Sequence, residues 1–128
     1  MASKRSCLLI VDDDTAIAAL LAQLLASDDY EVETAPDGRA ALDLIARRRF
    51  DLIVSDVWMP RLDGAGLYHE LARSRPDLAH RMVFVTGGPL TPDLQRLVER
   101  ANAPLLQKPF ELERLRRELR RVLERGAA

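Results

Sequence analysis

Five polar residues in this sequence have the types and the spacing that phosphoryl-transfer chemistry requires. They follow or end short apolar runs, and they are Asp12, Asp13, Asp56, Thr86 and Lys108. Three carboxylates close together repel one another unless a cation binds between them, and hard oxygen ligands of this kind suit Mg²⁺. A carboxylate beside Mg²⁺ and a lysine can attack a phosphoryl group, because the metal, the ammonium and the hydroxyl neutralise charge on the transferred oxygens.

Each of these residues also has a plain structural explanation when it is taken alone. An aspartate can cap a helix, a threonine can form a turn, and a lysine is usually solvated. These explanations do not account for the joint position of the five residues, which depends on the elements that carry them.

The runs before the polar residues have the composition of buried strands. Residues 52–54 are apolar and rich in β-branched side chains, which suits a strand buried on both faces of a parallel sheet. Asp56 stands where this run ends, and Pro60 prevents further strand pairing. Similar strands are expected at residues 7–11, 30–35, 81–86 and 104–107.

Segments with helical periodicity separate these strands, and each begins near a residue suited to cap a first turn. The caps are Asp14 or Thr15, Asp37, Asp63 or Gly64, and Thr91 followed by Pro92. A last helix is expected over residues 111–125. Strand and helix therefore alternate five times, which predicts an α/β fold with a doubly wound parallel sheet. The carboxyl ends of its strands share one rim, where the five polar residues should meet.

Length and composition favour one domain over residues 1–128, with a core of about 6–125. Charged residues make up 30% of the 128 residues and the net charge is -1, which argues against disorder and against a general polyanion-binding surface. The basic runs at residues 47–49 and 114–121 are interpreted as solvated helix faces, so no nucleic-acid partner is expected. His69 and His80 are expected to be surface residues.

The single cysteine and the absence of long apolar stretches indicate the cellular compartment of the protein. Cys7 alone excludes an internal disulfide and a multi-cysteine metal site, and its apolar neighbours predict that it is buried in a strand. No apolar run approaches the roughly 20 residues that span a bilayer, and the first run is too short for a signal peptide. We therefore expect a cytoplasmic protein with no membrane contact.

Taken in order, these motifs resemble the receiver domain of two-component response regulators over almost the whole chain. The motifs that match are Asp12-Asp13, Asp56 within residues 51–60, Asp63-Gly64, Thr86-Gly87, and Lys108-Pro109-Phe110. The resemblance implies a flavodoxin-like (βα)5 fold with strand order 2-1-3-4-5. It also implies a protein that is not an enzyme, but catalyses its own phosphorylation and dephosphorylation, as a monomer or weak dimer.

The same resemblance implies a role for each residue at the rim. Asp56 would accept a phosphoryl group from a histidine kinase or a histidine phosphotransfer protein, and a protein-interaction surface would switch in response. Asp13, Asp56 and the backbone carbonyl of Trp58 would bind Mg²⁺, with Asp12 acting mainly through bound water. Thr86 and Lys108 would bind the phosphoryl oxygens. The peptide bond between Lys108 and Pro109 would be cis.

Two features depart from the usual receiver pattern. The family usually has Tyr or Phe three residues before the lysine, whereas this chain has Leu105, so the usual threonine-to-aromatic switch lacks its ring at this position. Thr86 is followed by Gly87-Gly88-Pro89, which predicts a looser segment around the fourth of the expected helices. Both features resemble receivers at the ends of hybrid histidine kinases, so the chain is read as a stand-alone receiver or one excised from such a kinase.

Two other classes of protein are weighed against this interpretation. A phosphatase of the haloacid dehalogenase type also uses an aspartate nucleophile and Mg²⁺. Its motif needs Thr or Val at the last place of the segment 12–16, where this chain has Ala16, and there is no length for a cap region. A pseudo-receiver would keep the fold as an interaction module without phosphorylation; the intact set of polar residues argues against it, and a phosphorylation test decides.

Overall fold

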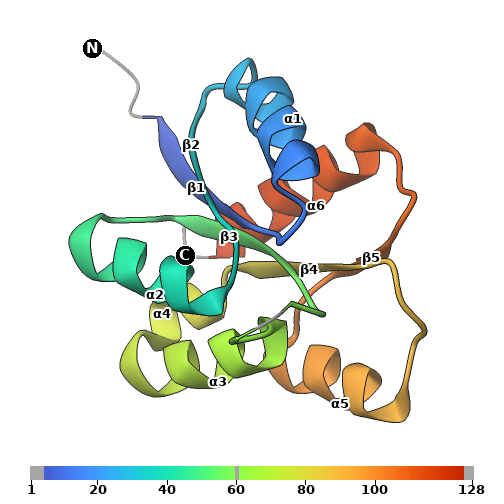
Figure 1. Cartoon of the computed structure of the whole chain (residues 1–128). Coiled ribbons are helices and arrows are strands. Elements are labelled where there is room, and N and C mark those ends of the chain that lie inside the picture. Colours follow the sequence, from blue (N-terminus) through green and yellow to red (C-terminus); the bar gives the residue numbers. More distant parts are fainter. Residues whose placement is uncertain (1–4, 60, 126–128) are drawn as a thin grey trace.

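Five parallel strands form one sheet in the computed structural model, which describes residues 5–59 and 61–125. The spatial order is β2-β1-β3-β4-β5, which confirms the expected order 2-1-3-4-5 (Figure 1). The strands are β1 (Ser6–Val11), β2 (Tyr30–Ala35), β3 (Leu52–Asp56), β4 (Met82–Thr86) and β5 (Leu105–Gln107). The position of Pro60, expected to stop strand pairing, lies outside the described residues, as do residues 1–4.

Helices cover both faces of this sheet, as a doubly wound fold requires (Figure 1). They are α1 (Thr15–Ala26), α2 (Gly38–Arg47), α3 (Gly64–Ser74), α4 (Pro76–Ala79), α5 (Pro92–Ala101) and α6 (Leu112–Glu124). The core on one face contains residues of α1 and α6, and the core on the other contains residues of α2 to α5. No helix among the described residues is both long enough and apolar enough to cross a membrane.

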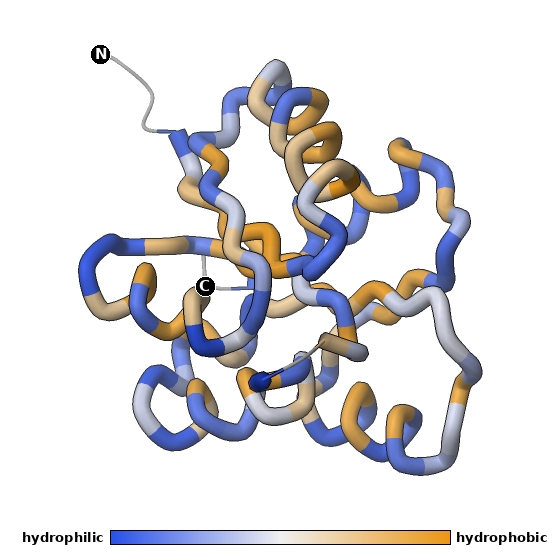
Figure 2. The backbone as a smooth tube through the Cα atoms, in the orientation of Figure 1, coloured by the Kyte–Doolittle hydropathy of each residue, from blue (hydrophilic) through white to orange (hydrophobic). Residues whose placement is uncertain are grey.

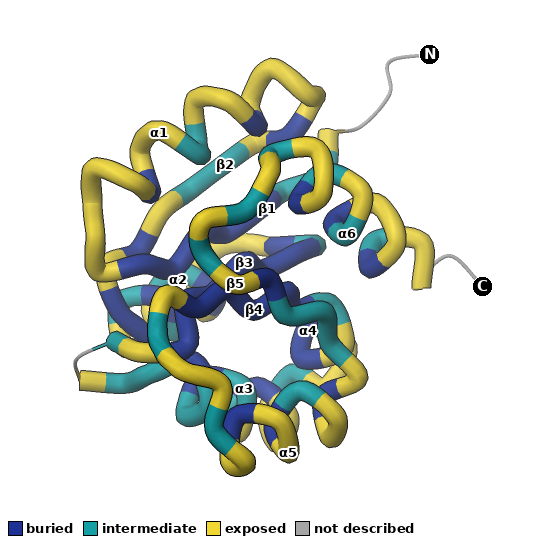
Figure 3. Tube along the Cα trace, turned by 90° about the vertical axis from the view of Figure 1, so that its right-hand side faces the viewer, coloured by how far each residue is buried: buried dark blue, intermediate teal, exposed yellow. Residues whose placement is uncertain are grey.

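Alternating side chains of the central strands explain why their sequences are apolar throughout. In β1, Leu8 and Ile10 enter the core under α1 and α6, whereas Leu9 and Val11 enter the core under α2 to α5. All four are at most 1% exposed. Burying each such side chain contributes about 1.5–3 kcal/mol. Figure 2 shows apolar colour in the interior of the molecule, and Figure 3 shows the central strands β1, β3 and β4 as mostly buried.

The helix starts follow the capping residues in the sequence. Asp14, and not Thr15, caps α1 by accepting a hydrogen bond from the backbone of Ile17. Asp63 caps α3 in the same way, and Thr91 caps α5 with a proline in the first turn. These short polar contacts determine where each helix begins after its loop.

Two expectations about local structure are wrong. A single helix was expected between β3 and β4, but α3 is followed by the separate four-residue helix α4, because Pro76 disfavours helical backbone at Arg75 and restarts the helix after it. Cys7 is only partly buried, because it lies near the start of β1, and its thiol contacts the Glu31 carboxylate at 3.5 Å. His69 and His80 are exposed, as expected.

Candidate functional site

Polar residues meet at the rim formed by the carboxyl ends of the strands. Asp56 is the last residue of β3 and Thr86 is the last residue of β4. Asp12 follows β1 directly, and Lys108 follows β5 directly. The parallel register pairs Asp56 with the residue before Thr86, so these strand ends lie level with one another. The sheet alone therefore brings together residues that are up to 96 positions apart in the sequence.

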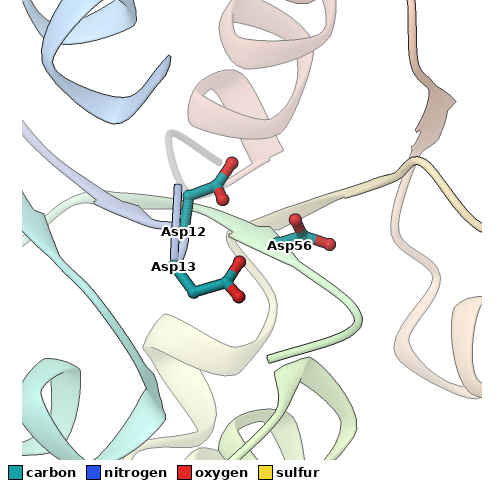
Figure 4. Close-up of side chains that lie close together, drawn as sticks. All are labelled: Asp12, Asp13 and Asp56. Atoms are coloured by element: carbon teal, nitrogen blue, oxygen red, sulfur yellow. The ribbon is translucent and has the colours of Figure 1, made fainter. Parts of the chain in front are cut away.

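Three carboxylates form an acidic cluster at the centre of this rim. Asp12, Asp13 and Asp56 each offer an oxygen, and these oxygens all lie within 4.8 Å of one another. Figure 4 shows the two side chains that follow β1 beside the side chain at the end of β3. Asp12 and Asp56 are buried, whereas Asp13 is exposed. Hard carboxylate oxygens at this spacing, partly open to solvent, fit the ligand preference of Mg²⁺.

Lys108 holds two of these carboxylates by direct ion pairs. Its Nζ lies 3.1 Å from Oδ2 of Asp12 and 3.1 Å from Oδ2 of Asp56. Burial works to lower the pKa of Lys108, but the hydrogen bonds to Asp56 and Asp12 outweigh it, so the pKa is raised. The ammonium therefore stays charged at neutral pH and offsets part of the carboxylate repulsion.

The backbone around Lys108 fixes the direction of its side chain. Its N–H donates to the carbonyl of Thr86 at 2.7 Å, which joins β5 to β4 at the rim. The bond between Lys108 and Pro109 is cis, as the resemblance implies.

The Asp56 carboxylate is nearly inaccessible to solvent, with 7% of the residue exposed. Burial raises its pKa, and the hydrogen bond and charge of Lys108 offset this only in part. Its Oδ1 accepts a hydrogen bond from the backbone N–H of Trp58 at 3.2 Å. The two oxygens are thus oriented separately, one by Lys108 and the other by the backbone that follows β3.

Thr86 is fully buried, and its hydroxyl accepts a hydrogen bond from the N–H of Gly88 at 3.1 Å. Trp58, two residues after Asp56, is 46% exposed. Leu105 pairs with Phe84 in the sheet, so an aliphatic side chain occupies the position where the family usually has an aromatic one.

The β3–α3 loop, residues 57–63, is tied to α2 by contacts that sequence reasoning missed. Arg61 adopts a left-handed backbone conformation, with φ of 66°. Its guanidinium contacts Oδ2 of Asp37 at 2.6 and 2.7 Å. Asp37, 3% exposed, also caps α2. The capping N–H of Ala40 and the Arg61 charge hold the pKa of Asp37 below its usual value, in spite of burial. The sequence identified Asp37 only as a cap, because no spacing rule links it to a loop residue 24 positions away.

Backbone contacts fix the same loop at both of its ends. The N–H of Gly38 donates to the carbonyl of Leu62 at 2.8 Å, and the N–H of Gly64 donates to the carbonyl of Val57 at 3.0 Å. A Cβ on Gly38 would lie 2.5 Å from the Leu62 oxygen, so only glycine permits this approach. The described residues on both sides of the loop, Val57 and Leu62, are therefore joined to neighbouring helices by backbone hydrogen bonds.

Comparison with known proteins identifies the family of this fold and site. The model of the response regulator receiver domain matches residues 8–120. The chain belongs to this family. It is a receiver domain of the two-component response regulators, a class of signal-transduction domains that generally act without enzymatic activity on other molecules.

Similar proteins include the response regulator MprA of Mycolicibacterium vanbaalenii, which is 39% identical over 118 residues. That match covers 92% of this chain and 50% of the relative. MprA of Mycobacterium avium is 37% identical over 118 residues, with 92% of this chain and 51% of the relative covered. The receiver domain thus spans about half the length of these curated relatives.

Solved structures share the fold of this receiver domain. Chemotaxis protein CheY4 of Vibrio cholerae is 33% identical, with a TM-score of 0.81, and the match covers 92% of this chain and 98% of that one. A CheY-like receiver domain of Methanospirillum hungatei is 29% identical, with a TM-score of 0.81 and coverage of 95% and 99%. NtrX of Brucella abortus is 29% identical, with a TM-score of 0.85, and covers 96% of this chain but 28% of its own.

Proposed function

We propose that this receiver domain, over residues 1–128 with a core of about 6–125, takes a phosphoryl group onto Asp56 and switches a protein-interaction surface. The donor would be a phosphohistidine of a histidine kinase or a histidine phosphotransfer protein. The observation that carries the proposal is the buried Asp56 carboxylate at the sheet rim, paired with Lys108 and adjacent to two further carboxylates. A charged cluster at the carboxyl ends of parallel strands lowers the stability of the fold unless a bound ligand offsets the repulsion between its charges.

In the proposed reaction, one oxygen of Asp56 forms a bond to phosphorus as the bond between phosphorus and the donor imidazole nitrogen breaks. The bonding electrons leave with the imidazole, which takes up a proton. Lys108 is already within ion-pair distance of Asp56, so its ammonium can bind a phosphoryl oxygen with a small movement. The Thr86 hydroxyl can donate to a second phosphoryl oxygen once it turns from Gly88. Hydrolysis of the acyl phosphate by water would return Asp56 to its resting form.

The residues that would hold Mg²⁺ are Asp13, Asp56 and the backbone carbonyl of Trp58, with Asp12 acting through bound water. The carboxylate cluster supports this assignment, because its oxygens lie close enough to share one cation. When bound, Mg²⁺ supplies positive charge that lowers repulsion between the carboxylates and the incoming phosphoryl oxygens. Before the metal binds, these residues would hold their oxygens on one side of the rim.

Incubation with acetyl phosphate, followed by intact-mass measurement and peptide mapping, tests the proposal. We expect the mass of one phosphoryl group on Asp56 in the presence of Mg²⁺, and none after EDTA treatment. The variant Asp56→Asn should take up no phosphoryl group, whereas Asp43→Asn, at an exposed position within α2, should take it up normally. If neither acetyl phosphate nor a phosphohistidine protein labels the folded chain, the protein is a pseudo-receiver.

A further inference from the structure

The side chain of Trp58 lies against the loop that carries the Thr86 hydroxyl. A Cβ built on Gly88 would lie 2.9 Å from Nε1 and 3.0 Å from Cδ1 of Trp58. The indole therefore occupies the space that any side chain at position 88 would need. Glycine at this position permits the aromatic ring of the β3–α3 loop to contact the β4–α5 loop, residues 87–91.

Gly88 contacts the Thr86 hydroxyl on the same side. Its N–H donates to Oγ1 of Thr86, and the Cβ position that faces the indole lies 3.8 Å from that oxygen. The indole, the Gly88 backbone and the hydroxyl thus form one contiguous group. Movement of the hydroxyl toward Asp56 either breaks the hydrogen bond from Gly88 or carries Gly88 with it, and in the second case the indole loses its contact.

The backbone of Trp58 is held by a hydrogen bond, whereas its side chain borders solvent. The N–H donates to Oδ1 of Asp56, and the neighbouring loop residues are fixed to α2. By contrast, the side chain is 46% exposed, so solvent borders it on one side. A ring on a fixed backbone, with one face on the loop and another in water, can move without disturbing the core.

We propose that Trp58 is the aromatic residue that positions Thr86 in this receiver, in place of a ring at position 105. At rest the indole supports Gly88, and the Gly88 N–H holds the Thr86 hydroxyl in its resting orientation. When Asp56 carries a phosphoryl group, the hydroxyl turns to donate to a phosphoryl oxygen, the Gly88 loop follows, and the indole takes a new position. This inference rests on the proposed function, because it assigns the means by which phosphorylation of Asp56 is transmitted.

The resting contact is tested by amide exchange of Gly88 in the full chain without ligand. We expect exchange to be roughly fivefold faster in Trp58→Leu, which is the size expected from loss of support for about one net hydrogen bond. The ring in Trp58→Phe should restore most of the protection. The control Leu90→Ala removes another exposed apolar side chain of the same loop and should leave Gly88 unchanged. Equal exchange in wild type and Trp58→Leu would overturn the positioning role.

The response to phosphorylation is tested with beryllofluoride and Mg²⁺, because Trp58 is the only tryptophan and its fluorescence reports this ring alone. We expect a shift in emission in wild type, and a loss of at least half of that shift in Thr86→Val. Fluorine NMR measures beryllofluoride on Asp56 in both proteins. An equal shift at equal occupancy would show that the indole senses the ligand without Thr86, which overturns the inference but leaves the proposed function intact. Absence of bound ligand and of phosphorylation in wild type would instead refute the proposed function.

Discussion

On one side of Asp56, the β3–α3 loop is fixed by an ion pair and by backbone hydrogen bonds to α2 and α3. On the other side, the β4–α5 loop consists of Gly87, Gly88, Pro89 and two further residues, and most of it is exposed. A Cβ on Gly38 has no space, whereas a Cβ on Gly87 would meet only the Lys108 side chain at 3.7 Å. The first loop is held by an ion pair and by hydrogen bonds near both ends, whereas the second has space beside Gly87.

This difference suggests a division of tasks between the two loops. Oxygens that bind a metal must keep their positions, which favours a loop held from both ends. A loop that responds to a phosphoryl group must have a second conformation of similar free energy, which favours few packed contacts. In this account, the β3–α3 loop supports the acidic cluster, and the β4–α5 loop with α5 carries the response.

The largest effect on the difference between the two loops is expected from removal of the Lys108 side chain. Lys108 pairs with Asp56, and its backbone is joined to Thr86. Lys108→Ala should still fold, but the response of residues 87–101 to beryllofluoride should be largely lost. The missing charge-assisted contact is worth roughly 1.5 to 3 kcal/mol. Amide exchange with and without the ligand measures this response.

The control for that experiment is Lys108→Arg, which keeps the positive charge and should retain part of the response. If residues 87–101 respond in Lys108→Ala as they do in wild type, Lys108 does not couple the site to the β4–α5 loop.

A pair of glycine substitutions sharpens the contrast in packing. Gly38→Ala should lower the free energy of unfolding by about 1–3 kcal/mol, because its Cβ would meet the Leu62 oxygen at 2.5 Å. Gly87→Ala should change it by less than about 0.5 kcal/mol, because that side of the rim has space. Urea denaturation of both variants measures the difference, and equal losses would contradict the view that the chain is more closely packed at Gly38 than at Gly87.

A smaller effect is expected from the ion pair between Asp37 and Arg61. Asp37→Asn keeps a side chain that caps a helix as well as aspartate does, but it removes the charge that pairs with Arg61. Because the Arg61 side chain is 67% exposed, we expect a loss of about 1 kcal/mol at neutral pH.

The pH dependence of this loss has a defined sign. The folded pKa of Asp37 lies below its ordinary value, so the unfolded chain binds more protons and the carboxylate stabilises the fold above the unfolded pKa of about 4. The difference between wild type and Asp37→Asn should therefore be constant near neutrality and should shrink as the pH falls below about 4. A difference that grows on acidification would exclude a stabilising carboxylate at this position.

Much of the fold follows from the sequence because its signals are local. The apolar runs of β1 and β3, and caps such as Asp14 and Thr91, each predict an element from a few adjacent residues. The orientation of α1 does not follow in this way. Ile17, Leu20 and Leu24 are 37–56% exposed although they recur at helical spacing, because this helix is apolar on most of its circumference and its pattern selects no single face (Figure 3).

The site, like the fold, has contacts that the sequence predicts and contacts that it does not. The rim residues could be predicted to meet because parallel strands end at one edge, and the geometry brings Asp56, Lys108 and the acid pair together. The contacts of Arg61 with Asp37, and of Trp58 with Gly88, could not be predicted. They depend on the paths of loops that are distant in sequence, and neither periodicity nor capping rules describe those paths.

The most direct test of the account is amide exchange of both loops with Mg²⁺ present, before and after addition of beryllofluoride. The account predicts that protection rises several-fold over residues 87–91 and changes by less than about twofold over residues 57–63, as expected for a local order transition beside a fixed segment. The variant Asp56→Asn should show neither change. Equal changes in the two loops, or a change confined to residues 57–63, would contradict the account.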